Sequence, residues 1–181
     1  MARVPELGAS ELSPEQKRIH DDIAAARGGR ASGPFGVWLR VPAIADAGNR
    51  LGNAVRRDGK LEARLFELMV LVVMRHWTAH YAWRVHSEAA REAGLAPAVI
   101  DAIGERRPPP FAREDERLIF DTVTELLERR ALSQQSYDRA VAALGTELLI
   151  ELIAGTGFYT MVAMTLVSFD VPARPGGTPL T

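Results

Sequence analysis

The chain of 181 residues contains no cysteine. This absence excludes disulfides, thiolate nucleophiles and zinc–thiolate sites, so the protein cannot carry out thiol redox chemistry with its own side chains. The chain also lacks an excess of basic residues, because 22 Lys and Arg stand against 23 Asp and Glu. Nucleic acids and anionic membranes require a concentrated basic surface, so we expect neither as a partner.

Long apolar runs are scarce as well. The first residues hold no apolar run of the kind found in signal peptides. Residues 148–167 come closest to a membrane span, but they include Glu151 and three threonines. A spanning helix needs about 20 apolar residues with few charges. We therefore expect a cytoplasmic protein in which this segment is a core or subunit-interface helix.

Helix-favouring sequence is abundant. N-cap residues, prolines at first helical positions and glycine stops predict the boundaries of the helices. The predicted helices cover residues 14–26, 42–58, 60–77, 78–93, 98–103, 114–129, 134–143 and 145–170, with 30–41 irregular. The Val-rich run 68–74 alone could form a buried strand, but it continues a helix-favouring stretch without a turn signal. The sequence predicts one all-α helical bundle over 1–181, with its core at about 34–172 and an extended tail at 173–181.

Residues 76–86 are the densest group of potentially reactive side chains, with three of the four histidines and two of the three tryptophans. Histidine is the usual general acid or base near neutral pH. His76 and His80 share a helix face, whereas His86 points elsewhere. Three ligands from this helix therefore do not converge, and we expect neither a metal nor another cofactor.

Glu67 lies inside an apolar stretch, residues 65–74. A carboxylate that enters an apolar core must be paired or protonated. The alternative is that Glu67 lies on an exposed stripe with Lys60, Arg64 and Arg75, paired with Arg64; the residues leave both readings open. If the helices on either side of a short turn near residue 78 are antiparallel, Glu67 and His86 lie at nearly the same distance from that turn along the two helix axes. We therefore predict that these two side chains are in contact.

The spacing of these residues is similar to that of a known family. Glu67 precedes Ala79 by twelve residues, and His86 follows Ala82 by four. This frame resembles the carboxymuconolactone decarboxylase and alkylhydroperoxidase D-like family, whose peroxidases carry a Glu, a Cys-x-x-Cys and a His at these spacings. Further similar segments extend the resemblance over about residues 34–172; they are Glu-Ala-Gly-Leu at 92–95, Gly-Thr-Glu-Leu-Leu at 145–149 and Gly-Phe-Tyr at 157–159.

The resemblance implies an alkylhydroperoxidase D-like helical bundle that assembles as a homo-oligomer, a trimer or hexamer. It does not imply a peroxidase here, because Ala79 and Ala82 replace the thiols that attack peroxide and resolve the sulfenic acid. The decarboxylase branch uses no cysteine and acts on a lactone that carries a carboxylate. Many cysteine-free relatives have an acidic residue where this chain has Ala82, so their acid–base roles do not transfer directly.

We therefore expect a cofactor-independent lyase or isomerase that acts on a small carboxylated or lactone substrate. His86 would move protons, Glu67 would orient it, and Tyr81 or His80 would stabilise a developing oxyanion. Trp38 and Trp83 would form walls of the substrate pocket. The alternative is a non-catalytic small-molecule-binding or scaffold protein that has kept the fold, since fold does not determine function.

Overall fold

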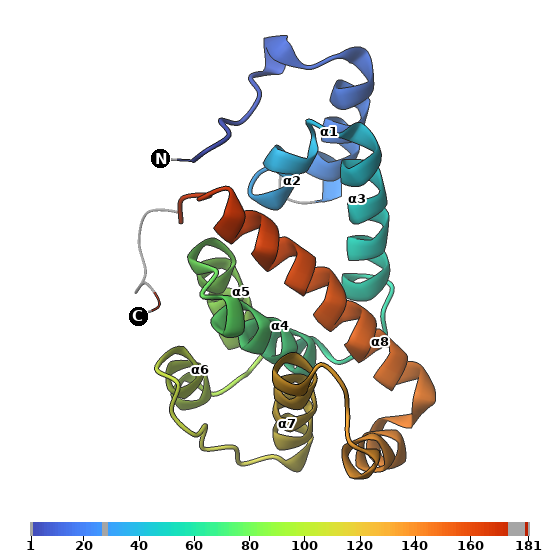
Figure 1. The fold of residues 1–181 in the computed structure, drawn as a ribbon, viewed down its shortest axis with the longest axis vertical. Coiled ribbons are helices and arrows are strands. Elements are labelled where there is room, and N and C mark those ends of the chain that lie inside the picture. Colours follow the sequence, from blue (N-terminus) through green and yellow to red (C-terminus); the bar gives the residue numbers. More distant parts are fainter. Residues whose placement is uncertain (1, 27–28, 174–179, 181) are drawn as a thin grey trace.

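The computed structural model describes residues 2–26, 29–173 and 180, and within these ranges the regular structure is helical, without a strand (Figure 1). This confirms the predicted all-α fold class. The elements in chain order are η1 (Ala9–Glu11), α1 (Pro14–Ala26), α2 (Pro34–Trp38), α3 (Pro42–Arg56), α4 (Ala63–Trp77), α5 (His80–Glu92), α6 (Pro97–Gly104), α7 (Glu114–Arg129) and α8 (Gln134–Ser168).

Helix α4 is the centre of the molecule. Every side chain from Arg64 to Arg75 is buried, and the helix packs against α5, α7 and α8. A helix that is apolar on nearly all sides is stable only where neighbours surround it. The Val-rich run is thus helical, as predicted. Thr78 ends α4 in the left-handed conformation, with φ 53°, and so turns the chain directly into α5.

Helix α8 bends at Gly145, whose φ of 76° and ψ of 165° are not helical. Two helices separated at this glycine, as the sequence predicts, therefore meet end to end. The longer part lies across the molecule with α3 on one side and α4 and α5 on the other (Figure 1). By length and composition α8 could cross a membrane, and half of its most apolar window is buried within the fold.

One segment of the N-terminal third departs from the predicted pattern. Residues 30–41 are not wholly irregular, because they contain α2, which begins at Pro34 after Gly33 at φ 66°. The proline ring fixes a helical φ at the first position of α2. This short helix places Phe35 in the core. The extended tail predicted at 173–181 falls largely on residues 174–179 and 181, which lie outside the described part of the chain.

Candidate functional site

The predicted contact between Glu67 and His86 is present. Oε2 of Glu67 lies 2.6 Å from Nδ1 of His86, and the two side chains are 7% and 8% exposed. Glu67 comes from the middle of α4 and His86 from the middle of α5, which run side by side. The exposed-stripe alternative is wrong, because Arg64 does not pair with Glu67 but with acidic residues of α7 and its own N-terminal turn.

This contact fixes the chemistry that the imidazole can offer. A carboxylate at Nδ1 is an acceptor, so in a neutral ring Nδ1 carries the proton and Nε2 presents a lone pair. The edge of the His86 ring also packs against Tyr159 of α8, with the ring centroids 5.1 Å apart and the planes perpendicular. The ring is therefore held on two sides, and Nε2 is the nitrogen that remains for a ligand.

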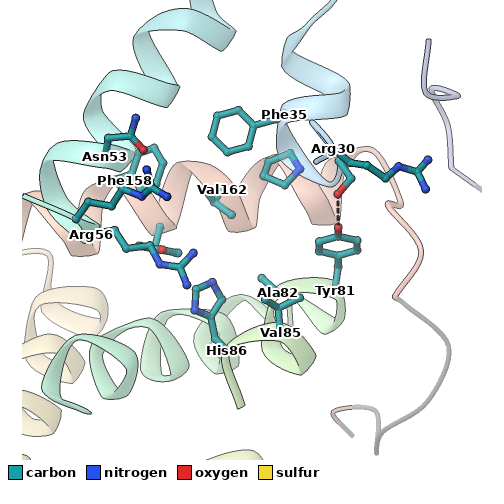
Figure 2. Close-up of a pocket in the computed structure, with 14 residues that line it drawn as sticks. Arg30, Phe35, Asn53, Arg56, Tyr81, Ala82, Val85, His86, Phe158 and Val162 are labelled. Carbon is teal, nitrogen blue, oxygen red and sulfur yellow. Dashed lines mark hydrogen bonds between the residues drawn. The ribbon is translucent and has the colours of Figure 1, made fainter. Parts of the chain in front are cut away.

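His86 lines a cavity of about 530 Å³ that lies between α2, α3, α5 and α8 (Figure 2). A cavity of this size suits a small organic molecule. Apolar side chains of α2, α5 and α8 form much of its wall. The polar lining includes His86 and a group of side chains from the segment before α2, from α3 and from α5; these are Arg30, Ser32, Asn53, Arg56, Arg57 and Tyr81.

Arg56 adds a cation next to the Glu67–His86 pair. Its Nη2 lies 3.8 Å from Oε1 of Glu67, and its side chain is 39% exposed. Figure 2 shows this side chain reaching from α3 toward His86, whereas Arg30 extends away at the other end of the cavity. Sequence reasoning missed Arg56, because it lies on a different helix and nothing in its spacing from Glu67 indicates proximity.

Tyr81 lies at the opposite end of the cavity from Arg56 (Figure 2). Its phenolic oxygen lies 3.2 Å from Oγ of Ser32, so the two hydroxyls are hydrogen-bonded. The ring passes close over Gly33, where an added Cβ would lie 2.7 Å from the ring carbon Cε1. Only glycine leaves this room and also tolerates the positive φ at this position. The structure thus brings the predicted Tyr81 to the cavity and adds Ser32.

His80 lies apart from these groups. It is the first residue of α5, six positions before His86, and it does not line the cavity. Its Nδ1 accepts a hydrogen bond from the backbone N–H of Leu180, at 3.1 Å. The two histidines therefore do not meet at one site in this structure.

The two tryptophans expected to wall the pocket do not line the cavity that contains His86. Trp38 is buried behind it, with its ring edge-on to Phe35 and Phe158 and its Nε1 donating to Oγ1 of Thr165 at 2.9 Å. Trp83 is also buried and packs toward Gly104 of α6. It follows Ala82 by one residue, which rotates it by about 100° away from the helix face that lines the cavity.

The two alanines at the cysteine positions of the family frame are both buried. Ala82 lines the cavity one turn before His86, and Ala79 immediately precedes α5. Small apolar side chains here leave space near the imidazole and supply no acid, base or nucleophile. Within the described residues, no group of three His, Asp or Glu side chains is placed to hold a metal ion.

The spacing of Glu67, Ala79, Ala82 and His86 agrees with a comparison of the chain with known families. A model of the carboxymuconolactone decarboxylase family matches residues 42–111. In that segment the chain is similar to this family. The match extends from α3 to just beyond α6 and includes Arg56, Glu67, Tyr81 and His86, whereas α2 and α8 lie outside it. No curated protein shows a significant match to the chain.

Proposed function

We propose that this protein is a carboxymuconolactone decarboxylase-like enzyme, a cofactor-independent lyase or isomerase for a small carboxylated or lactone substrate. The observation that carries the proposal is the buried Glu67–His86 pair beside a cavity that also presents Arg56. An oriented imidazole that meets a ligand-sized cavity is the arrangement that general acid–base catalysis requires.

Arginine side chains support an anionic substrate. Arg56 and Arg57 lie at the C-terminal end of α3, and both line the cavity. A guanidinium offers several N–H donors in a planar fork that matches a carboxylate. With a carboxylate held near Arg56, the rest of a small ring would extend between Phe158, Val162 and Phe35 toward Tyr81. This orientation brings the substrate over His86.

The proposed lyase step moves one electron pair and one proton. The bond between the ring carbon and the departing carboxylate breaks, carbon dioxide leaves, and the electron pair passes into the unsaturated lactone as an enolate. The hydroxyl of Tyr81, at the other end of the cavity from Arg56, would stabilise the enolate oxygen by hydrogen bonding. Protonated His86 then gives its Nε2 proton to carbon, and Glu67 stabilises the imidazolium before this transfer. An isomerase would use the same groups to remove a proton and return it elsewhere.

Thiol peroxidase activity is not part of the proposal. Ala79 and Ala82 cannot form the sulfenic acid or resolve it. The second candidate function is binding without catalysis, which Ala82 favours: it leaves the cavity without the acidic residue that many cysteine-free relatives carry at this position. The two candidates share the cavity and differ in whether His86 transfers a proton.

The test is turnover of a γ-lactone that carries a carboxylate. Carbon dioxide release and the ultraviolet absorbance of the lactone measure this turnover. We expect turnover by the wild type and its loss, by a factor of about 100 or more, in His86→Gln. The matched control is His20→Gln, which changes a half-buried histidine of α1 that does not line the cavity, and this variant should retain activity. Binding of the lactone without turnover by the wild type would instead support the binding protein.

We also propose that the protein is a soluble homo-oligomer, a trimer or hexamer, without nucleic-acid or membrane partners. Five large aliphatic side chains of α8 remain exposed on the chain and support an interface there; they are Ile150, Ile153, Met161, Met164 and Val167. Exposed apolar surface of this extent is typical of protein contacts. Light scattering should give a multiple of the 19.8 kDa chain mass, whereas a constant value near one chain would contradict the oligomer.

A further inference from the structure

A second cavity lies on the other side of α4. Its volume is also about 530 Å³, and it is enclosed by the C-terminal part of α4, the end of α6, the segment between α6 and α7, and α7. None of its lining residues lines the cavity at His86. The proposed lyase or isomerase mechanism makes no use of it.

Positive charge is concentrated in this second cavity. Four arginines line it, namely Arg75, Arg106, Arg107 and Arg117. The acidic lining residues are Asp121, which is hydrogen-bonded to Arg139 at 2.8 Å, and Glu128. Arg107 is held by Glu105 at 2.6 Å, just outside the cavity. The lining therefore has an excess of two positive charges, which favours an anion.

Arg75 is the buried member of this group, because it is 7% exposed and projects from the last turn of α4. Its Nη1 lies 3.2 Å from Oγ1 of Thr78. Burial lowers the pKa of this guanidinium, and the nearby positive charge of Arg106 lowers it further. Arg75 and Arg106 line the same cavity, so one carboxylate there could accept hydrogen bonds from both guanidinium groups.

Part of the cavity wall is apolar. The rings of Phe111 and Phe120 pack at a tilt with their centroids 5.3 Å apart, and the guanidinium of Arg117 lies 5.8 Å from the Phe111 centroid. Pro108 and Pro109 line the cavity beside them, where the pyrrolidine rings restrict the backbone. A flat apolar group could stack on this wall while an acidic group reached the arginines.

We propose that this cavity is a second binding site that takes an aromatic carboxylate. The carboxylate lies between Arg75 and Arg106, and the ring packs against Phe111 and Phe120. The paired guanidinium groups recognise the charge, and the wall selects an aryl group over a purely polar anion such as inorganic phosphate. The site is independent of the reaction proposed at His86.

Calorimetric titration of the full-length protein with 1-naphthoate tests this site. We expect saturable binding that weakens by about tenfold or more in Arg106→Asn, the loss expected when a hydrogen bond to a charged group is removed. Asparagine tolerates the left-handed backbone that Arg106 adopts, with φ 56°. The matched control is Arg130→Asn, which removes the same charge at another left-handed position, with φ 63°, outside both cavities. Its affinity should equal that of the wild type.

Two further titrations separate the competing explanations. Methyl 1-naphthoate keeps the ring and lacks the charge, so it should bind at least tenfold more weakly to the unmodified protein. Arg56→Gln alters only the cavity at His86 and should leave naphthoate affinity at the second site unchanged. The proposal is overturned if naphthoate fails to bind, if Arg106→Asn binds it as well as the wild type, or if only Arg56→Gln loses binding. None of these results depends on whether His86 is catalytic.

Discussion

Helix α4 contributes to two buried side-chain pairs that are alike in distance and exposure. Nη1 of Arg64 lies 2.6 Å from Oε1 of Glu116, and Oε2 of Glu67 lies 2.6 Å from Nδ1 of His86. All four side chains are between 5% and 8% exposed. The difference is access, because His86 lines a cavity whereas neither Arg64 nor Glu116 lines either cavity described above. Distance and burial alone therefore do not distinguish a reactive pair from a structural one.

The Arg64 pair is part of a closed cluster that joins α4 to the start of α7. Nη2 of Arg64 also contacts Asp115 at 2.8 Å and Glu62 at 3.2 Å. Burial opposes the charge of this guanidinium, but its hydrogen bonds to Asp115 and Glu116 outweigh that effect and raise its pKa. Both terminal nitrogens of the Arg64 guanidinium are therefore hydrogen-bonded to protein carboxylates. The cluster therefore stabilises the fold and offers nothing to a ligand.

The largest expected effect on stability comes from Arg64→Met. The substitution keeps most of the side-chain volume but leaves Glu116 buried without its cation, which should lower the free energy of unfolding by about 3–5 kcal/mol. Chemical denaturation measures this change. The control is Arg139→Met, which breaks the exposed Arg139–Asp121 pair and should cost less than about 1 kcal/mol. Equal losses of unfolding free energy in the two variants would show that the buried cluster stabilises the fold no more than an exposed ion pair does.

A smaller effect on stability is expected from Glu67→Gln, with a larger effect on function. The amide oxygen can still accept from Nδ1 of His86, so the stability loss should be about 1 kcal/mol. The imidazolium loses its compensating charge, so turnover of the carboxylated lactone should fall at least tenfold. Thermal denaturation and initial rates on the same preparation measure both. A variant with full activity would remove Glu67 from the mechanism and make its pair structural, like that of Arg64.

The smallest effect is expected from Asp115→Asn and depends on pH. The hydrogen bond from Arg113 holds the pKa of Asp115 well below its ordinary value of 3.8 against the opposing effect of burial, and Arg64 adds to the lowering. The stabilisation is therefore complete above that ordinary value and is lost as the pH falls toward the folded-state pKa. Because the side chain is 33% exposed, the loss at pH 7 should stay below about 1 kcal/mol. Urea unfolding at pH 7 and at pH 3 should show the wild-type advantage shrinking at the lower pH; a constant difference would contradict this account.

The sequence predicted one of these two pairs and not the other, for a physical reason. Glu67 and His86 lie on consecutive helices joined by a short turn, so helix rise alone sets their heights and predicts contact. Arg64 and Glu116 are 52 residues apart. They meet only because α7 packs against α4, and the sequence does not indicate which helices pack together. The same limit applies to Arg56, which reaches the site through the packing of α3 on α8.

Helix-capping and helix-breaking residues predicted the helix boundaries well, but the sequence did not predict which side chains line the cavity at His86. The helix at 114–129 has the predicted bounds, and Gly145 marks the predicted break. The expected roles of Trp38 and Trp83 rested on their residue type and on the position of Trp83 beside the histidines. Helical rotation turns Trp83 toward α6 instead, and α2, which the sequence pattern did not indicate, holds Trp38 behind the cavity.

The most direct test of His86 as the accessible acid–base group is deuterium incorporation during turnover. The carboxylated γ-lactone is incubated with protein in D₂O, and proton NMR follows deuterium entering the carbon positions of the decarboxylated or isomerised product. The wild type and Arg139→Met should incorporate deuterium at equal rates, and His86→Gln should fall to the uncatalysed rate while remaining folded. Equal incorporation by His86→Gln and the wild type, or none by the wild type, would contradict the claim that His86 is the accessible acid–base group.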